Sequence, residues 1–441
     1  MNRRQIAEQI FLAGVDSVLP DKLIAGNMSL IANILHIGDF CLPLEKTENI
    51  YLIGAGKASA IMASEVVKIL GDRITEGHII VKYGHGSVLK SIRVTEAGHP
   101  FPDLNGFNAT KRILEIARKA NANDLVICLI SGGGSSLLCD CPEELTPDDL
   151  ILVNKLLVNC GASISEINAV RKHLSKVKGG QLAGTVFPAT LVSLILSDVI
   201  GDPPDVIASG PTAPDPTTFI DAIEVLDKFN LRSSLPSRIL NFLYDGAKCK
   251  IPETPKPGDP VFERTTNLII GTNSLALERA RLKAIEYNIN AVIIEDELQG
   301  DTSSVAEYLV DTALRFKEDK KEVKPVCILF GGETTVKMTG KGAGGRNQHL
   351  ALLCARFLQN KPGITILSAG TDGNDGPTNA AGAVVDSDTI NFAVSKGIDP
   401  EKYLNEFNSY NFFKKTAGHI ITGPTMTNVM DIVVIIVDDQ K

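Results

Sequence analysis

The sequence of 441 residues predicts an α/β protein with two α/β domains, an N-terminal Rossmann-like doubly wound sheet and a C-terminal α/β domain. Short runs rich in Ile, Val and Leu alternate with helical patterns, which is typical of parallel strands covered by helices on both faces. The chain is also longer than one hydrophobic core usually serves. A polar stretch with four prolines, residues 245–266, separates the halves. We therefore expect domains at residues 1–245 and 267–441, a linker at residues 246–266, and an active site in the cleft between the domains.

The elements can be assigned in chain order. Ile6, Ile10, Val15 and Val18 recur at helical spacing and predict an N-terminal helix. Strands are expected at residues 50–53, 78–82, 91–96, 125–131, 189–196, 267–270, 291–295, 326–330, 364–369 and 432–437. Several of them end in glycine-rich or acidic segments. Because ligands gather at the carboxyl ends of strands in a doubly wound sheet, we expect functional residues there.

Composition narrows the class of protein. The net charge of -8 argues against a nucleic-acid surface or a polybasic membrane patch, so small-molecule partners are expected. The eight cysteines form no CxxC pair and sit mostly in apolar runs, which predicts free thiols in a reducing compartment. No apolar run approaches the ~18 residues of a membrane span, and no cleavable address is evident. We expect a soluble, cytoplasmic protein, and the prevalence of two-fold assemblies suggests a homodimer.

The segment GAGKAS, residues 54–59, follows the strand expected at residues 50–53. Gly54 and Gly56 nearly match the dinucleotide fingerprint, but the acidic residue expected about 20 positions later is missing. Lys57 stands where a helix would begin, and a lysine with free amides at that place suits phosphate. The alternative is a tight turn with a solvated lysine.

A second glycine-rich segment, SGGGSS, follows the strand expected at residues 125–131. Its glycines would let consecutive amides point into one concavity that binds an anionic oxygen, and its serines would add hydroxyl donors. The alternative is a structural turn, although three glycines in series exceed what a turn needs. The candidate binding residues are Ser131, Gly132, Gly133, Gly134, Ser135 and Ser136.

A third cluster is GKGAGGRNQ, residues 340–348, which is not a Walker A sequence. Arg346 lies just after its glycines and just before a helical pattern, where a guanidinium can fork onto phosphate or carboxylate. The alternative is an arginine at a helix N-terminus that pairs with a neighbouring carboxylate. Asn347 in this cluster and Asn273 in GTNS complete the candidate binding residues.

Acidic residues at strand ends could hold Mg²⁺, which prefers one or two carboxylates together with water and substrate phosphates. Asp198, Glu333 and Asp372 are the predicted metal ligands, with Asp202 and Asp375 as further candidates, although each could be a turn-forming residue. His99 could be a loop hydrogen-bonding residue or a catalytic base. A basic segment is expected to be a solvated surface from which Arg171 or Lys178 could reach substrate; it holds Arg171, Lys172, Lys176 and Lys178.

The chain resembles the glycerate 2-kinase family that ends in a MOFRL-type domain. The matching stretches lie in the right order along nearly the whole chain: GAGKAS, GHPFPD, SGGGSSLL, EINAVRKHLSKVKGGQLA, LSDVIGDPPDVIASGPTAPDPTTF, GGETTV, GGRNQ, GTDGNDGPTNAAGAVVD and TGPTMTNVMDIVV. The resemblance implies transfer of phosphate from ATP, with Mg²⁺, to the 2-hydroxyl of D-glycerate. It places the lysine and arginine of the family on Lys57 and Arg346. This chain departs from the family pattern at His349, where a glutamate is usual, and at Asn379, where an aspartate is usual.

Three functions follow from these patterns. In the kinase, Lys57 and Arg346 would stabilise the transferring phosphoryl group, and SGGGSS would bind an anionic group of nucleotide or glycerate. In an NAD(P)H-dependent hydroxypyruvate reductase, GAGKAS would be the dinucleotide turn, and its missing acidic residue counts against this alternative. A protein that senses sugars or nucleotides would bind anions through the same clusters without turnover.

Overall fold

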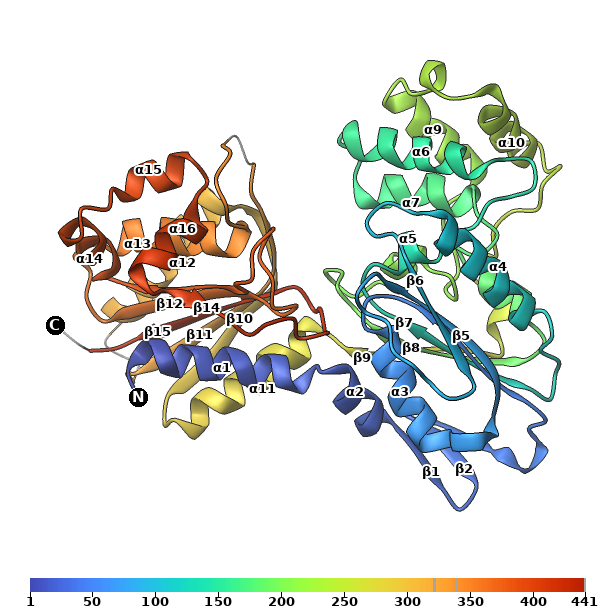
Figure 1. Cartoon of the computed structure of the whole chain (residues 1–441), viewed down its shortest axis with the longest axis horizontal. Helices are drawn as coiled ribbons and strands as arrows, with labels where there is room; N and C mark the ends of the chain where they lie inside the picture. Colours follow the sequence, from blue (N-terminus) through green and yellow to red (C-terminus); the bar gives the residue numbers. More distant parts are fainter. Residues whose placement is uncertain (320–322, 338–339, 440–441) are drawn as a thin grey trace. The chain divides into compact units, whose positions relative to one another are not determined.

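The computed structural model describes residues 1–319, 323–337 and 340–439, and its contacts divide the chain into two compact units (Figure 1). The N-terminal unit comprises Pro20–Ile270. The C-terminal unit comprises Met1–Leu19 together with Gly271–Lys441. Both units contain a six-stranded sheet with helices packed on it, which confirms the expected pair of α/β units.

The sheet of the N-terminal unit has the strand order β6-β5-β4-β7-β8-β9. The pairs β4–β5, β5–β6, β4–β7 and β7–β8 are parallel, as expected for a doubly wound sheet. The strand order reverses between β4 and β7, so the turns that follow these two strands lie side by side. The elements of this unit are α2 Pro20–Asn27, β1 Met28–Ile31, β2 Ile34–Ile37, β3 Phe40–Pro43, β4 Ile50–Ala55, α3 Ser59–Leu70, β5 Ile74–Lys82, β6 Ile92–Ala97, α4 Leu104–Ala117, β7 Leu125–Ile130, α5 Gly134–Leu137, α6 Pro147–Asn159, α7 Ile164–His173, α8 Gln181–Val186, β8 Thr190–Leu196, α9 Phe219–Lys228, α10 Ser237–Ala247 and β9 Thr265–Gly271.

The central strands β4 and β7 are buried along their whole length, which explains their continuous apolar sequences IYLIGA and LVICLI. Helices α4 and α8 share one core cluster with Ile53 and Val126 of these strands. Helix α3 contacts β4, β5 and β7 but contributes no residue to that cluster, so it covers the other face. Helices α6, α7, α9 and α10 form a separate helical lobe with its own core (Figure 1).

The expected domain boundaries differ from the observed units at both ends of the N-terminal unit. The segment expected as a linker packs against this unit: Asp215 N donates to the carbonyl oxygen of Pro255 at 2.9 Å, and Thr254 Oγ1 donates to Asp215 Oδ2 at 3.0 Å. The strand expected to open the C-terminal domain, residues 267–270, is β9 at the edge of the N-terminal sheet. Helix α1, Arg3–Ser17, belongs to the C-terminal unit.

The C-terminal unit contains a mixed sheet of order β10-β11-β15-β12-β13-β14, whereas the alternation of strands and helices in the sequence is typical of parallel strands. Strands β10 and β11 are parallel, but β15 runs antiparallel to both of its neighbours, β11 and β12. Antiparallel strands need no crossover helix, and none lies between β14 and β15. Besides α1, the elements are α11 Asn273–Glu286, β10 Asn290–Asp301, α12 Thr302–Glu318, β11 Val326–Thr335, α13 Arg346–Leu358, β12 Ile364–Gly370, β13 Gly382–Asp386, α14 Thr389–Ser395, α15 Pro400–Asn405, α16 Ser409–Thr416, β14 His419–Ile420 and β15 Asp431–Val437.

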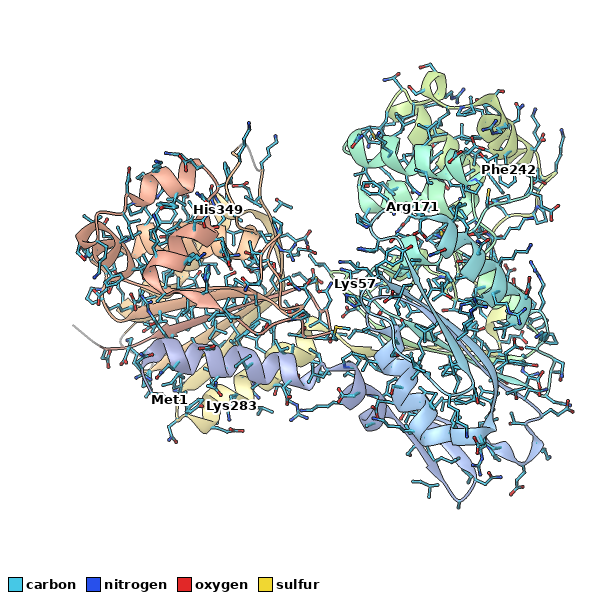
Figure 2. All side chains as sticks on the ribbon, in the orientation of Figure 1. Met1, Lys57, Arg171, Phe242, Lys283 and His349 are labelled. Carbon is cyan, nitrogen blue, oxygen red and sulfur yellow. The ribbon has the colours of Figure 1, made fainter. Side chains whose placement is uncertain are left out.

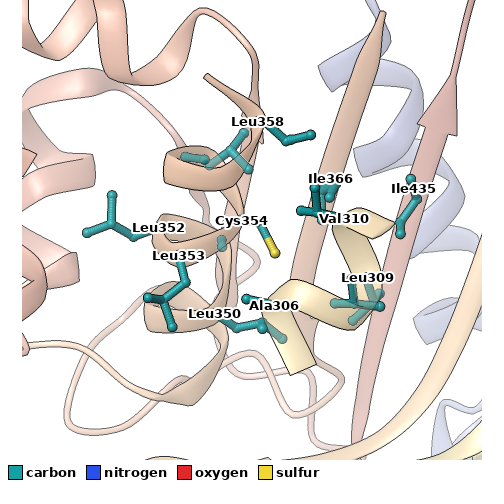
Figure 3. Packing of buried hydrophobic residues seen from close by; sticks show 14 of the residues in the cluster. Ala306, Leu309, Val310, Leu350, Leu352, Leu353, Cys354, Leu358, Ile366 and Ile435 are labelled. Atoms are coloured by element: carbon teal, nitrogen blue, oxygen red, sulfur yellow. The ribbon is translucent and has the colours of Figure 1, made fainter. Parts of the chain in front are cut away.

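Helices cover both faces of this mixed sheet (Figure 1). On one face α1 packs beside α11 and contacts β12 and β15 through buried side chains that include Ile10 and Phe11. On the other face α13 packs against α12, and Leu350 and Cys354 meet the apolar side chains of α12, β12 and β15 (Figure 3). The N-terminal end of α13, which carries Arg346, is thereby fixed to the sheet.

Candidate active site

Two glycine-rich turns lie side by side at the carboxyl edge of the N-terminal sheet. GAGKAS begins at the end of β4 and SGGGSS follows β7, and Ala55 pairs with Ile130 at the ends of these strands. The turns are joined by hydrogen bonds: Lys57 N donates to the carbonyl oxygen of Gly132 at 3.0 Å, and Ala58 N donates to Ser131 Oγ at 3.0 Å. The two predicted anion-binding segments therefore form one local structure at the point where the strand order reverses.

Three of the predicted binding residues have a clear packing role in this structure. A Cβ on Gly54 would lie 2.3 Å from the carbonyl oxygen of Leu129, and one on Gly56 would lie 2.1 Å from Ser131 Oγ. Ser131 is 1% exposed, and its hydroxyl is occupied between the two turns. The glycines are needed because the neighbouring strand and turn approach so closely, and a role in ligand binding stays a prediction for all three.

Lys57 and His99 lie against the bare backbone of Gly133. Gly133 has φ 82°, and a Cβ there would lie 2.8 Å from ring atoms of His99 and 3.5 Å from Lys57 Cε. Burial lowers the pKa of His99 to about 4, with a further contribution from the charge of Lys57. The imidazole is therefore neutral near pH 7, and it is a weaker base than a free imidazole. A lysine cation and a neutral imidazole thus face the same glycine (Lys57 is labelled in Figure 2).

The remaining residues of SGGGSS lead from this glycine into a cavity. Gly132 and Gly134 are buried, and a Cβ on Gly134 would lie 2.8 Å from Ala208 Cβ. Ser135 Oγ hydrogen-bonds with Ser209 Oγ at 2.7 Å, and Ser136 Oγ donates to the carbonyl oxygen of Gly133 at 3.1 Å. Both serines line a cavity of about 200 Å³ whose other walls come from α6, α7, the segment after α7 and the segment that contains Phe101.

Arg171 and Lys178 supply the positive charge of this cavity. Arg171 Nε donates to Asn154 Oδ1 at 2.5 Å, and Lys178 Nζ donates to the carbonyl oxygen of Leu138 at 2.5 Å. No carboxylate in the described part of the chain lies within 4.0 Å of either charged group. Burial lowers the pKa of both side chains. Asp140, which lines the same cavity, offsets part of the Lys178 charge, and both side chains have more N–H donors than these hydrogen bonds use.

The expectation of a solvated basic surface around these residues is wrong. Lys178 is 6% exposed, and Lys172 is 2% exposed because its ammonium group pairs with Asp215 at 3.1 Å and with Asp205 at 3.3 Å. Lys176 alone among the four basic residues is exposed. The partners of Lys172 lie more than thirty positions away in the sequence, so local periodicity could not predict its burial.

In the C-terminal unit, Arg346 is the first residue of α13 and pairs with two carboxylates. Nε and Nη2 donate to the two carboxylate oxygens of Asp431 at 2.6 and 2.9 Å, and Nη1 forms an ion pair with Glu333. Burial by itself would lower the pKa of Arg346, but Asp431 and then Glu333 outweigh it and raise the pKa above its usual value. Arg346 is thus an arginine at a helix N-terminus that pairs with carboxylates, as the alternative interpretation of the sequence described. Its side chain is still 32% exposed.

The Asp375 carboxylate caps the N-terminal end of α13. Its carboxylate accepts hydrogen bonds from Asn347 N at 3.0 Å, Gln348 N at 2.8 Å and Gln348 Nε2 at 2.9 Å. A Cβ on Gly345 would lie 2.2 Å from Asp375 Oδ1, so only glycine allows this approach. Burial raises the pKa of Asp375 to about 6 although these hydrogen bonds oppose the shift. The carboxylate thereby fixes the turn that presents Arg346.

The two predicted asparagines are buried among protein partners. Asn347 Oδ1 accepts a hydrogen bond from Ser368 Oγ at 2.6 Å. Asn273 Nδ2 donates to the carbonyl oxygens of Val429 at 2.7 Å and Asp431 at 3.0 Å. Asn273 therefore positions the start of β15, which carries the partner of Arg346. A direct contact of either asparagine with a ligand stays a prediction.

The predicted metal ligands are distributed over both units. Asp198 follows β8 in the N-terminal unit, whereas Glu333 and Asp372 belong to the C-terminal unit. Glu333 already pairs with Arg346, and Asp372 Oδ1 accepts a hydrogen bond from Asn374 N at 3.0 Å. Among residues 1–319, 323–337 and 340–439, no group of three or more His, Cys, Asp or Glu side chains could hold a metal ion. Asp198 and Asp372 still have the oxygen chemistry that Mg²⁺ prefers when phosphates complete its shell.

The two departures from the family pattern are accommodated by aromatic partners. His349 stacks on Phe407 with ring centroids 4.8 Å apart, and burial lowers its pKa to about 4. Asn379 Oδ1 accepts a hydrogen bond from the Tyr410 hydroxyl at 2.8 Å. A buried neutral ring and an amide take the places of two carboxylates. Asn379 has a hydrogen-bond partner, whereas His349 is held by stacking and its Nδ1 is buried without a hydrogen-bond partner among the described residues.

Sequence reasoning missed Asp431, the bidentate partner of Arg346, and Asp140, which lines the cavity beside Lys178. Asp431 lies in TGPTMTNVMDIVV, a stretch that carries the family resemblance, and this was the available signal. Asp140 offered none, because its role depends on Ser175 and Lys176, which are 35 and 36 positions away.

Comparisons with known proteins agree with this picture. Residues 6–244 match the domain of unknown function DUF4147, and residues 326–431 match the MOFRL family. A D-glycerate 2-kinase from Thermotoga maritima is 38% identical over 433 residues, which is 98% of this chain and 97% of that protein. A protein from Agrobacterium vitis whose name provisionally assigns a hydroxypyruvate reductase is 38% identical over 440 residues, 99% of this chain and 95% of the relative.

A solved structure extends the agreement to the fold. The crystal structure of a glycerate kinase from Thermotoga maritima superposes with a TM-score of 0.87 at 38% sequence identity, covering 98% of this chain and 99% of that one. A search of the described residues for helices long and apolar enough to cross a membrane finds none. From the matches along nearly its whole length, the chain belongs to the glycerate 2-kinase family, in which a DUF4147 domain precedes a MOFRL domain.

Proposed function

We propose that this chain is an ATP-dependent kinase that transfers the γ-phosphoryl group of ATP to the 2-hydroxyl of D-glycerate. The products are 2-phospho-D-glycerate and ADP. A new P–O bond forms to the hydroxyl oxygen, the bond to the leaving oxygen of ADP breaks, and the hydroxyl proton is released. The observation that carries the proposal is the pair of hydrogen-bonded turns. In these turns Lys57 and His99 face Gly133, and the last two serines of SGGGSS line a cavity that also contains two cations.

Phosphoryl transfer needs positioning and neutralisation of charge on the equatorial oxygens more than covalent help from the protein. Lys57 supplies a cation at the strand-end crevice where doubly wound sheets bind ligands. Arg346 supplies a second cation, and the remaining N–H groups of its guanidinium can donate although Asp431 and Glu333 occupy the others. That both cations act on one phosphoryl group stays a prediction.

Mg²⁺ would contribute charge neutralisation on the phosphates when it is bound with ATP. We assign Asp198 as the first residue to test for this ion, because it follows β8, the neighbour of β7 in the sheet. Glu333 fits the ion less well, since its carboxylate forms an ion pair with Arg346. Asp372 belongs to the C-terminal unit, and a role for it in holding the ion stays a prediction.

One assay separates the proposed kinase from the alternatives. Purified protein is incubated with ATP, MgCl₂ and D-glycerate, ADP release is followed, and the position of the phosphate is determined by NMR; a parallel reaction contains NADH and hydroxypyruvate. Glycerate-dependent ADP release with phosphate on O2 is expected, together with no oxidation of NADH. Oxidation of NADH without a requirement for ATP would instead establish the reductase. Binding of ligands without either turnover would establish a sensor.

A further inference from the structure

We propose that the cavity lined by Ser135, Arg171 and Lys178 binds the carboxylate of the phosphoryl acceptor, and that the nucleotide phosphates do not occupy it. This inference deepens the proposed function and rests on it for the identity of the acceptor. The cavity is defined by its cations, its serines and the apolar side chains of α6 and α7.

The first argument is the state of the two cations. Buried cations are normally paired with carboxylates, because leaving an unpaired charge out of water is costly. Lys178 is 6% exposed and donates to one carbonyl, and Arg171 donates to one amide; neither has a carboxylate within 4.0 Å among the described residues. Arginine provides five donors in a fixed fork that matches a carboxylate. A bound carboxylate would accept hydrogen bonds from the N–H groups of both side chains and would balance their charge.

The second argument is the net charge of the cavity. The charged groups among its lining residues are Arg171, Lys178 and Asp140. Both oxygens of Asp140 already accept hydrogen bonds, one from Ser175 Oγ and the other from Lys176 N. With Asp140 ionised and both cations charged, the cavity therefore keeps one net positive charge, which favours an anionic ligand.

The third argument is size and polarity. A cavity of about 200 Å³ suits a compact acid, and its apolar wall includes Phe107, Val153 and Leu174. Apolar side chains beside the cations lower the local dielectric constant, so the attraction of the cations for one carboxylate is stronger than it would be in bulk solvent. A triphosphate would need more charge than one net cation supplies.

The fourth argument is continuity with Lys57. Lys57 and His99 lie against Gly133, and Ser135, which is only two residues later in the chain, lines the cavity. Two residues span at most about 7 Å of extended chain, and less within a helical turn. The cavity therefore begins within two residues of the glycine that Lys57 faces, and in the proposal the 2-hydroxyl of the acid points toward Lys57 while its carboxylate lies at Arg171.

The test compares three single variants in the full chain: Arg171→Gln, Arg171→Lys, and Lys176→Gln as the matched control. Lys176 is an exposed lysine of the same segment that does not line the cavity. We expect Arg171→Gln to raise the KM for D-glycerate roughly 10- to 100-fold, the loss of one charge-assisted hydrogen-bond pair, with an unchanged KM for ATP. Arg171→Lys should recover part of this loss, and the control should behave as wild type. A raised KM for ATP with an unchanged KM for D-glycerate would overturn the proposal.

Direct binding separates this inference from the proposed function. Calorimetric titration of D-glycerate, with a non-hydrolysable ATP analogue present, is carried out on wild type, Arg171→Gln and Lys176→Gln. Binding that is lost only in Arg171→Gln supports the cavity even if the wild type shows no turnover, and in that case the kinase assignment alone fails. Equal binding by all three proteins contradicts the cavity while leaving kinase turnover to decide the function. Absence of binding to the wild type contradicts both.

Discussion

Lys57 and Arg346 differ in the charges around them. Arg346 forms ion pairs with Asp431 and Glu333, so most of its positive charge is compensated within the protein. Lys57 Nζ has no carboxylate within 4.0 Å among the described residues, and His99, which faces the same glycine, adds no negative charge. An uncompensated cation attracts an anionic ligand more strongly than a paired one. Lys57 is therefore the residue on which neutralisation of the transferring phosphoryl depends most.

Replacement of this lysine tests the point at the scale of one residue. Lys57→Ala should lower kcat by about 10³-fold or more at saturating ATP and D-glycerate, because cations of this kind contribute that much in related phosphoryl transfers. The control is Lys68→Ala, which removes a lysine whose side chain is 66% exposed on the neighbouring helix α3. Steady-state ADP release measures both variants. A Lys57→Ala variant with near-normal kcat would remove Lys57 from the mechanism.

The same residues show what a sequence can predict about a site. The position of Lys57 and Arg346 directly after glycine clusters was sufficient to select both cations. Their surroundings were not predictable, because the pairing of Arg346 with Asp431 joins positions 85 residues apart. The two asparagines selected beside glycines are buried, and their side chains hydrogen-bond to other parts of the protein. Their sequence pattern could not show this, because a polar residue at a strand end has the same local pattern whether it faces a ligand or the protein.

At the scale of elements, the turn between β7 and α5 is the part whose shape the chemistry requires. Gly133 has φ 82°, a conformation that L-residues rarely adopt, and its bare Cα leaves space for the His99 ring. Gly161, after α6, has φ 78°, but a Cβ added there would have nothing within 4 Å. The two glycines thus share the backbone conformation and differ only in what an added methyl group would meet.

This pair gives a matched prediction. Gly133→Ala and Gly161→Ala should each destabilise the protein by about 1 kcal/mol from the left-handed conformation. Gly133→Ala should in addition displace the His99 ring, which an added Cβ would approach to 2.8 Å, and lower kcat by at least about tenfold, which is the effect of a small misplacement of catalytic groups. Urea unfolding and steady-state kinetics measure the two effects separately. Equal kcat in the two variants would show that the contact at Gly133 does not matter for turnover.

The elements themselves were largely predictable from apolar periodicity. Every expected strand is present, and β10 is longer than expected, Asn290–Asp301 in place of residues 291–295. Among the described residues, the strands that were missed are β1, β2, β3, β13 and β14. Each has five residues or fewer, which is too few for a clear alternation. Strand direction in the mixed sheet was not predictable either, since periodicity is the same in both directions.

At the scale of the molecule, the position of helix α1 sets the division into units. Its apolar stripe was predictable, but the face that it covers was not, because that face is built from residues more than 250 positions away. Arg4 pairs with Asp386 through Nε–Oδ2 at 2.6 Å and Nη2–Oδ1 at 2.7 Å, and Thr427 Oγ1 donates to the carbonyl oxygen of Val18 at 2.6 Å. The start of the chain is therefore part of the C-terminal core, and residues 1–19 should lose structure together with that unit.

Hydrogen exchange on two matched variants tests this assignment. Phe11 of α1 is 0% exposed and Phe219 of α9 is 3% exposed, so each Phe→Ala change should cost its unit about 3–5 kcal/mol. Phe11→Ala should increase amide exchange in α11, β12 and β15, because α1 packs on these elements, while β4 and β7 keep their protection. Phe219→Ala should loosen the helical lobe of the N-terminal unit and leave β12 and β15 unchanged. If Phe11→Ala instead increased exchange in β4 and β7, residues 1–19 would belong with the N-terminal domain, as the sequence alone suggested.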